Sequence, residues 1–234
     1  ILLEGNERCG EPIKTATGGH TSRNVVELSD GTLLFGVSIG DSSVAYVWRS
    51  RDAGQTWDHG ERVKIGDYNG KPYDNPAGFF AEDFTFLTNS GKLLHWIRCG
   101  PPSPMYPMDD GRAVPKTNDQ GNRSMICQSN DDGRTWVNLR DFGDYGMMYI
   151  RVIRLRDGRL LMTYTQRSTF PPLGLRAMFS HDDGETWDFQ YDQLIIEGKT
   201  PWGMASGGGF GNTVQFDDHG EPGLVSAYTY RGAD

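Results

Sequence analysis

An eight-residue pattern, Ser-x-Asp-x-Gly-x-Thr-Trp, occurs three times in this chain, at residues 50–57, 129–136 and 180–187. Five fixed positions that return three times indicate a repeated structural unit, while the unequal spacing indicates loops of different length. Asp can accept backbone hydrogen bonds in a tight turn, Gly can take a positive φ, and the Thr-Trp pair begins a strand that buries the indole. By itself, then, the pattern predicts a structural turn. Its defining residues are Asp52, Gly54 and Trp57, then Asp131, Gly133 and Trp136, and finally Asp182, Gly184 and Trp187.

Hairpins are predicted between these turns, where two apolar strands flank a short polar turn at residues 25–34, 84–94, 152–161 and 214–225. An outer strand that leads into a copy of the repeated turn follows each of the first three hairpins. This order predicts four-stranded antiparallel units in series. Because no stretch has an apolar period of 3.6 residues, the sequence predicts an all-β fold, and specifically a β-propeller.

The triple pattern resembles the Asp-box, or bacterial neuraminidase repeat, of the sialidase (neuraminidase) superfamily, and the resemblance covers nearly the whole chain. It implies a six-bladed propeller, with seven blades as the alternative, in which the box joins the third and fourth strands of a blade. The blades are expected at 22–66, 80–142, 148–197 and, incomplete, 208–234. A blade takes roughly 40–50 residues, so the 234 residues are expected to be an internal fragment, with three blades and part of a fourth.

Candidate site residues follow from position, because the inner strands of a propeller begin near its axis and the residues there converge on one pocket. Arg98 ends the strand after Glu82, and Arg167 lies at a comparable strand end. His20 precedes Arg23 and can face the same pocket. Carboxylate, phenol and guanidinium groups together suit a sugar acid. Aligned on Leu28, Leu87, Leu155 and Phe216, the residues five positions earlier are Arg23, Glu82, Ile150 and Gly211, with Tyr149 and Arg151 beside them.

The resemblance also implies roles for these residues. The segment from Glu82 to Arg98 is similar to a sialidase segment whose Glu supports a tyrosine nucleophile and whose Arg binds the substrate carboxylate. Arg23 takes the place of the family's first arginine, although its segment lacks the family's aromatic residue, Ile and Pro. Asp41 takes the place of the general acid/base. The third arginine is expected to be Arg151, with Arg167 as second choice. The candidates for the catalytic tyrosine are Tyr149, Tyr228 and Tyr230, although the family's tyrosine belongs to a late blade. Tyr228 and Tyr230 are read as alternating strand residues, so Tyr149 is the predicted catalytic tyrosine.

Composition limits the classes of molecule that the protein is expected to bind. The net charge of −8 argues against nucleic acid or an anionic membrane surface, and no apolar run is long enough to span a membrane. Three cysteines, Cys9, Cys99 and Cys127, are too few for a disulfide scaffold and are expected to be buried thiols. No Cys-x-x-Cys motif or histidine cluster indicates a metal site, and no cofactor is expected. The resemblance implies a secreted or periplasmic protein.

The predicted function is that of an exo-α-sialidase, which removes terminal sialic acid or a related acidic sugar from a glycan. Two alternatives stay open. The same groups could serve a polysaccharide lyase or a hydrolase of another sugar, because proton abstraction beside a uronate carboxylate uses similar chemistry. The propeller could also be a non-catalytic module that binds glycans or proteins, since fold does not determine function. The sequence leaves the oligomeric state open.

Overall fold

The computed structural model describes the backbone of residues 19–39, 45–58, 67–68, 71–72, 79–100, 105–107, 113–115, 123–144, 146–167, 173–197, 211–218 and 221–228. These residues form strands, turns and one 3-10 helical turn, Phe189–Tyr191, and they contain no α-helix. The all-β prediction is therefore confirmed for the part of the chain that the structure describes.

The first three sheets are antiparallel meanders whose main strands follow chain order. The first contains β1 (Gly19–Glu27), β2 (Leu33–Ile39) and β3 (Ala45–Ser50). The second contains β6 (Phe79–Leu87), β7 (Leu93–Gly100), β10 (Arg123–Ser129) and β11 (Val137–Phe142), with the short β4 (Asp67–Tyr68) and β5 (Lys71–Pro72) beyond β11. The third contains β12 (Met147–Arg154), β13 (Leu160–Gln166), β14 (Gly174–Ser180) and β15 (Gln193–Glu197).

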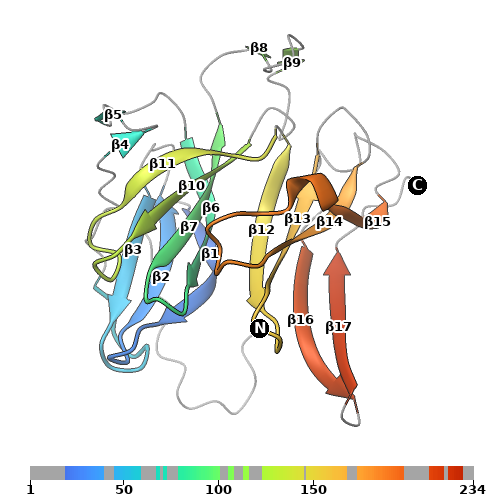
Figure 1. Ribbon diagram of the computed structural model, residues 1–234. Coiled ribbons are helices and arrows are strands. Elements are labelled where there is room, and N and C mark those ends of the chain that lie inside the picture. The colour runs from blue at the N-terminus through green and yellow to red at the C-terminus, as the bar shows by residue number, and fades with distance from the viewer. Residues whose placement is uncertain are drawn as a thin grey trace.

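The fourth sheet is a hairpin of β16 (Gly211–Asp218) and β17 (Glu221–Tyr228), and a small ribbon pairs β8 (Met105–Pro107) with β9 (Ala113–Pro115). The first strand of each main sheet is its inner strand. The inner strand β1 lies against β6, β6 against β12, and β12 against β16, and Figure 1 follows this succession from blue through green and yellow to red. Meanders arranged in this way around a common axis are the blades of a partial β-propeller.

Two apolar clusters hold neighbouring sheets together. One joins Val26 and Leu34 of the first sheet with Leu93 and Trp136 of the second. The other joins the second and third sheets and includes Phe84, Trp96, Val152 and Met162. A fully buried side chain of this kind stabilises the fold by about 1.5–3 kcal/mol. The core therefore lies between the sheets, which fixes how neighbouring inner strands face one another.

The three repeated turns have the same hydrogen-bond pattern. In each copy the Asp Oδ1 atom accepts the backbone N–H of the Thr four residues later, at 2.9 Å. The Asp Oδ2 atom accepts the Thr hydroxyl at 2.5–2.6 Å. The Ser hydroxyl oxygen accepts the Gly N–H at 2.8–2.9 Å. Each Gly has a positive φ, as does the residue before it. The turns close the link between the third strand of a sheet and its outer part.

The tryptophans that end these turns differ in burial. Trp136 is completely buried, as predicted, but Trp57 and Trp187 are only partly buried. Trp57 packs on Phe35 with ring centroids 5.8 Å apart, and its indole N–H donates to the carbonyl of Gly54 at 3.1 Å. The prediction of a buried indole is thus wrong for two copies. Trp57 packs on Phe35, which is itself only partly buried, and Trp187 packs at the edge of the apolar cluster that contains Trp96 and Phe142.

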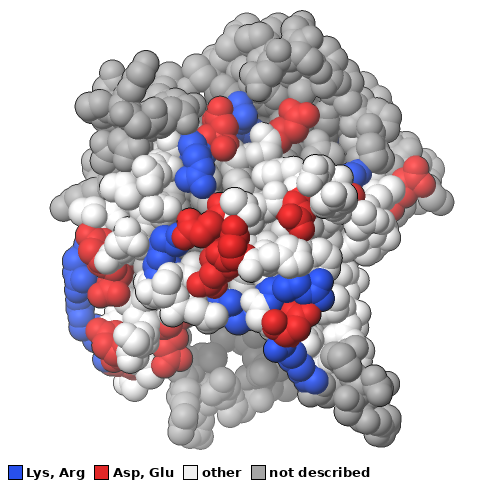
Figure 2. Space-filling model, viewed as in Figure 1, with Lys and Arg blue, Asp and Glu red and all other residues white. Residues whose placement is uncertain are grey.

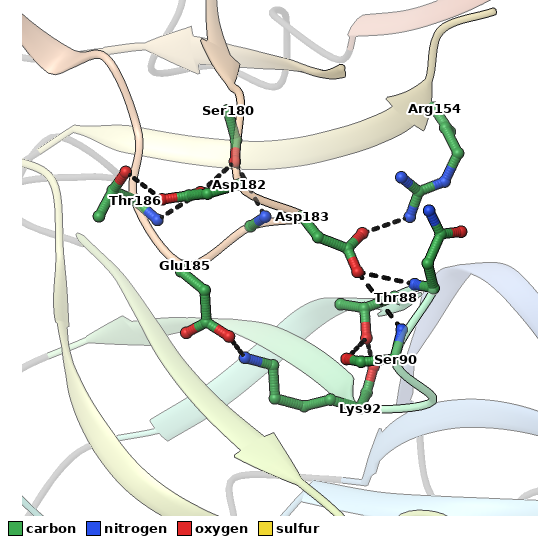
Figure 3. A network of polar contacts seen from close by, with 11 residues as sticks. Thr88, Ser90, Lys92, Arg154, Ser180, Asp182, Asp183, Glu185 and Thr186 are labelled. Atoms are coloured by element: carbon green, nitrogen blue, oxygen red, sulfur yellow. Dashed lines mark hydrogen bonds and ion pairs between the residues drawn. The ribbon is translucent and has the colours of Figure 1, made fainter. Parts of the chain in front are cut away.

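The third turn also binds the second sheet (Figure 3). Asp183 Oδ2 accepts the backbone N–H groups of Asn89 at 2.8 Å and Ser90 at 3.4 Å, and Asp183 Oδ1 lies 2.5 Å from Arg154 Nη2. Beside this contact, Lys92 forms an ion pair with Glu185. The turn of the third sheet is therefore fastened to the β6–β7 hairpin turn of the sheet before it.

Candidate functional site

A bulge interrupts three successive inner strands near their N-terminal ends. Pairing with the next strand shifts between Thr21 and Val25 in β1, between Ala81 and Phe84 in β6, and between Met148 and Arg151 in β12. Bulges re-aim side chains and are frequent beside active sites. The predicted residues Arg23, Glu82 and Tyr149 all lie inside them, which brings the three positions to the same end of the sheets.

Glu82 and Tyr149 have the same unusual backbone. Their φ angles are +48° and +57°, values that L residues seldom adopt. A non-glycine residue in this conformation costs about 1–2 kcal/mol, and such strain tends to persist where the surroundings enforce it. The bulge therefore presents both side chains in one backbone geometry on two adjacent sheets.

The hairpin turns correct the sequence alignment by one residue. Leu28, Thr88 and Leu155 each donate their N–H across the turn and accept the N–H of the turn glycine. Thr88, and not Leu87, is thus the equivalent of Leu28 and Leu155. Counted from these turns, Glu82 corresponds to Tyr149, and Arg23 does not share the position of Glu82. The alignment failed because leucine precedes Thr88 where the other two hairpins have leucine at the turn itself.

Arg98 joins these two residues. It lies near the C-terminal end of β7, opposite Ala81, and its Nη1 atom forms an ion pair with Glu82 Oε2. The same nitrogen donates to the Tyr149 hydroxyl at 3.2 Å. The Glu82 and Arg98 side chains are only 13% and 11% exposed. A carboxylate, a guanidinium and a phenol from two sheets therefore meet in a sheltered place, where screening by solvent is reduced.

A second arginine covers the phenol. The guanidinium carbon of Arg167 lies 4.4 Å from the centre of the Tyr149 ring, and that of Arg98 lies 5.8 Å from it. Arg167 is completely buried, and its backbone N–H donates to the carbonyl of Gly146 at 2.8 Å. Two cations beside one phenol stabilise negative charge on its oxygen.

Arg151, the first choice for the third arginine, packs elsewhere. Its guanidinium carbon lies 5.1 Å from the centre of the Phe84 ring, two residues after Glu82. Burial lowers the pKa of Arg151 from its usual value. Among the described arginines, Arg98 and Arg167 thus contact Tyr149, while Arg151 lies over the ring of Phe84.

Several predicted residues fall outside the described side chains. His20 and Arg23 lie in the first part of β1, where only the backbone is described, and His20 pairs with Ser38. Asp41 lies outside the described residues altogether. The structure thus brings together Glu82, Arg98, Tyr149 and Arg167, and it leaves the placement of the His20, Arg23 and Asp41 side chains as predictions.

Sequence analysis missed a buried polar group beside Glu82. Asp83, Thr85 and His95 are at most 5% exposed. The signal was present, because these polar residues interrupt apolar strands, but nothing in the sequence distinguished them from strand residues that face solvent.

In the described part of the chain, no three His, Cys, Asp or Glu residues are grouped so as to hold a metal ion. Cys127 is a buried thiol, as predicted, and its Sγ lies 3.8 Å from the carbonyl oxygen of His95. Cys9 and the Cys99 side chain lie outside the described part. Within that part, no helix has the length and apolar character needed to cross a membrane.

A pocket of about 260 Å³ lies away from these residues, between the β12–β13 turn and the fourth sheet. Its lining includes Leu155, Arg159 and Leu224. Because Tyr149 lies near the start of β12 and Leu155 follows its end, the pocket is at the opposite end of the strand from the candidate site. Basic and acidic side chains are intermingled on the face that Figure 2 shows.

No family model and no curated protein matches the sequence. Solved structures match in fold. A protein of unknown function from Dyadobacter fermentans has a TM-score of 0.58 at 19% identity, over 88% of this chain and 52% of its own. The NanB sialidase from Streptococcus pneumoniae has a TM-score of 0.54 at 13% identity, over 91% and 51% of the two chains. A Hadza microbial sialidase, Hz136, has a TM-score of 0.50 at 21% identity, over 72% and 36%.

This chain therefore spans about half of the first two of these proteins. At such identities the likeness establishes the fold alone. Together with the four successive antiparallel sheets, it shows that the chain has the fold of part of a sialidase-type β-propeller.

Proposed function

We propose that the protein is a carbohydrate-active hydrolase of the exo-α-sialidase type, with the candidate site at the bulges of β1, β6 and β12. The observation that carries the proposal is the single Arg98 nitrogen that contacts both the Glu82 carboxylate and the Tyr149 phenol. The three repeated turns are then Asp-boxes, and the blades are those delimited at 22–66, 80–142, 148–197 and 208–234.

The chemistry assigns Tyr149 as nucleophile and Glu82 as its base. A retaining glycosidase ordinarily uses a carboxylate nucleophile, but an anion would be repelled by the carboxylate that a sialic acid carries beside its reacting carbon. In the first step the phenol oxygen bonds to the anomeric carbon and its proton passes to Glu82. The bond to the leaving oxygen breaks, and that oxygen takes a proton from Asp41.

In the second step Asp41 takes a proton from water, and the water oxygen bonds to the anomeric carbon. The bond to the Tyr149 oxygen breaks, and Glu82 returns the proton to it. Arg23, Arg98 and Arg151 or Arg167 bind the substrate carboxylate, because a guanidinium forks onto a carboxylate through two parallel hydrogen bonds. His20 lines the same pocket.

One observation favours a second function, a propeller that binds glycans or proteins without catalysis. Glu82 is ion-paired with Arg98, and Tyr149 is only 4% exposed. In a binding module this pair would simply stabilise the bulges. In the hydrolase the substrate carboxylate must draw Arg98 away from Glu82, which frees the carboxylate to accept a proton.

Turnover of a fluorogenic α-sialoside by the complete protein tests the proposal, together with its Tyr149→Phe and Glu82→Gln variants. We expect kcat to fall at least about 100-fold in each, since each removes a group needed for bond making or proton transfer. Tyr164→Phe is the matched control, because Tyr164 is also 4% exposed but bonds to Asp192 on the outer part of the third sheet.

A fluorinated sialic acid that traps a glycosyl-enzyme should add its mass to the peptide that contains Tyr149. No turnover and no adduct, in folded protein, would refute the sialidase assignment. Retained binding of a glycan in that case would support the binding module, and turnover of another glycoside would support a different sugar specificity.

A further inference from the structure

The inner edge strand of the second sheet has an unusual partner. Among the described strands, β6 pairs only with β7, so half of its backbone N–H and C=O groups face away from the sheet and need other partners. At Thr85 these two groups are bonded by one side chain. Asn24 Nδ2 donates to the carbonyl of Thr85 at 2.6 Å, and the N–H of Thr85 donates to Asn24 Oδ1 at 3.3 Å.

This carboxamide therefore pairs with the backbone as a neighbouring strand would. Asn24 belongs to β1 in the first sheet and stands directly after Arg23, inside the bulge of that strand. Thr85 stands three residues after Glu82 and directly after Phe84, where regular pairing with β7 resumes. The two hydrogen bonds thus connect the bulge that carries Arg23 with the bulge that carries Glu82.

The side chain of Thr85 continues the connection. Its hydroxyl forms a hydrogen bond with His95 Nδ1 at 2.7 Å, and His95 Nε2 lies 3.7 Å from Asp83 Oδ2. His95 is completely buried, and burial lowers its pKa to about 3, so it is neutral over the working pH range. Asp83, the residue next to Glu82, packs so closely on the first sheet that a Cβ atom at Gly36 would overlap its carboxylate.

We propose that Asn24 is a positioning residue, which sets the bulge of β6, and hence Glu82, relative to Arg23 in the neighbouring sheet. Its role for turnover rests on the proposed function. Asn24 contacts the backbone of Thr85. It acts through Thr85, and the buried Thr85, His95 and Asp83 side chains hold the other face of the same segment.

Two variants of the complete protein test this role, with Val25→Ala as matched control because Val25 is the next residue of β1 and is 49% exposed. Asn24→Ala removes both hydrogen bonds. We expect faster hydrogen exchange in peptides that cover residues 82–88, and a kcat about 10-fold lower, since small misplacements of catalytic groups cost this much or more. The Val25→Ala variant should match the parent in both measurements.

Asn24→Asp supplies a readout that a merely structural role would not move. Its carboxylate can accept from the N–H of Thr85 but repels the carbonyl, whereas the protonated acid can both accept and donate. An exposed aspartate titrates near about pH 3.9. Turnover of Asn24→Asp relative to the parent should therefore recover as the pH is lowered from 7 toward 4.

Unchanged exchange in residues 82–88 of Asn24→Ala would overturn the proposal. Faster exchange with unchanged turnover would overturn it as well, and so would a turnover ratio for Asn24→Asp that does not vary with pH. If the parent protein hydrolyses no glycoside, the proposed function fails, and the exchange measurement alone then decides whether Asn24 holds the bulge.

Discussion

The two ends of the inner strands β6 and β12 differ in how closely they repeat each other. At the C-terminal end, both strands enter hairpin turns that have the same hydrogen bonds and a glycine of positive φ. The repeated eight-residue turns are just as alike, because in each copy the Asp side chain forms the same hydrogen bonds with Ser and Thr. At the N-terminal end, the backbone repeats but the side chains do not, because the same bulge position carries Glu82 in one strand and Tyr149 in the other. Repetition of side chains thus marks the scaffold, and a repeated backbone with different side chains marks the candidate site.

The largest effect is expected at Gly36, where β2 of the first sheet packs against the bulge of β6 in the second sheet. In Gly36→Ala the new methyl group would overlap the buried Asp83 carboxylate. We expect a loss of about 3 kcal/mol in the free energy of unfolding, the upper range for overpacking, and reduced turnover in the protein that still folds. Denaturant unfolding and kcat measure the two effects. Wild-type stability would show that β2 and β6 separate without cost.

The scaffold end should respond in stability alone. In Asp131→Ala the second repeated turn loses bonds from Ser129, Arg134 and Thr135. A loss of about 2 kcal/mol is expected, as for removal of a strong helix cap, with kcat unchanged in folded protein. A drop in kcat without a change in stability would contradict the separation of scaffold and site.

Two copies of one position sharpen the comparison within the scaffold. Asp183 binds Arg154 and the backbone of Asn89 and Ser90, whereas Asp132, at the same place in the second turn, pairs with Arg134 of its own exposed turn. Asp183→Ala should lower the free energy of unfolding by about 1 kcal/mol, and Asp132→Ala by less than about 0.5 kcal/mol. Equal losses would mean that the contact between sheets contributes nothing.

The smallest expected effect is a loss of stability at acidic pH. Hydrogen bonds, chiefly from the Thr56 hydroxyl, lower the pKa of Asp52 to about 2, against about 3.9 in an unfolded chain. Because the folded pKa is lower, the stabilisation is complete above about pH 4 and disappears as the pH falls through about 2. The parent should therefore lose more stability than Asp52→Asn between pH 4 and 2. Parallel curves from thermal unfolding would contradict this assignment.

The sequence predicted the turns and hairpins because both depend on local chemistry: Asp, Gly and Thr at fixed offsets, and apolar strands around a short polar turn. It also predicted Glu82 and Arg98, since a separation of sixteen residues across one hairpin brings them to the same end. It failed where counting residues fails. The alignment took Leu87 as the equivalent of Leu28 and Leu155, whereas the turn hydrogen bonds place Thr88 there, so the match of Glu82 with Tyr149 was missed. Contacts such as Asn24 with Thr85 join residues 61 apart, and no local pattern encodes them.

The hydrogen bonds of Asp183 to the preceding hairpin have a consequence for folding during synthesis on the ribosome. Residues 79–100 leave the exit tunnel well before residues 180–187, so the backbone groups of Asn89 and Ser90 that Asp183 binds are synthesised first. The third sheet then meets a partner edge of the second sheet that was synthesised before it, as in repeat proteins whose units are stabilised by their nearest neighbours. The sheets would therefore pack in chain order, starting from the N-terminal side.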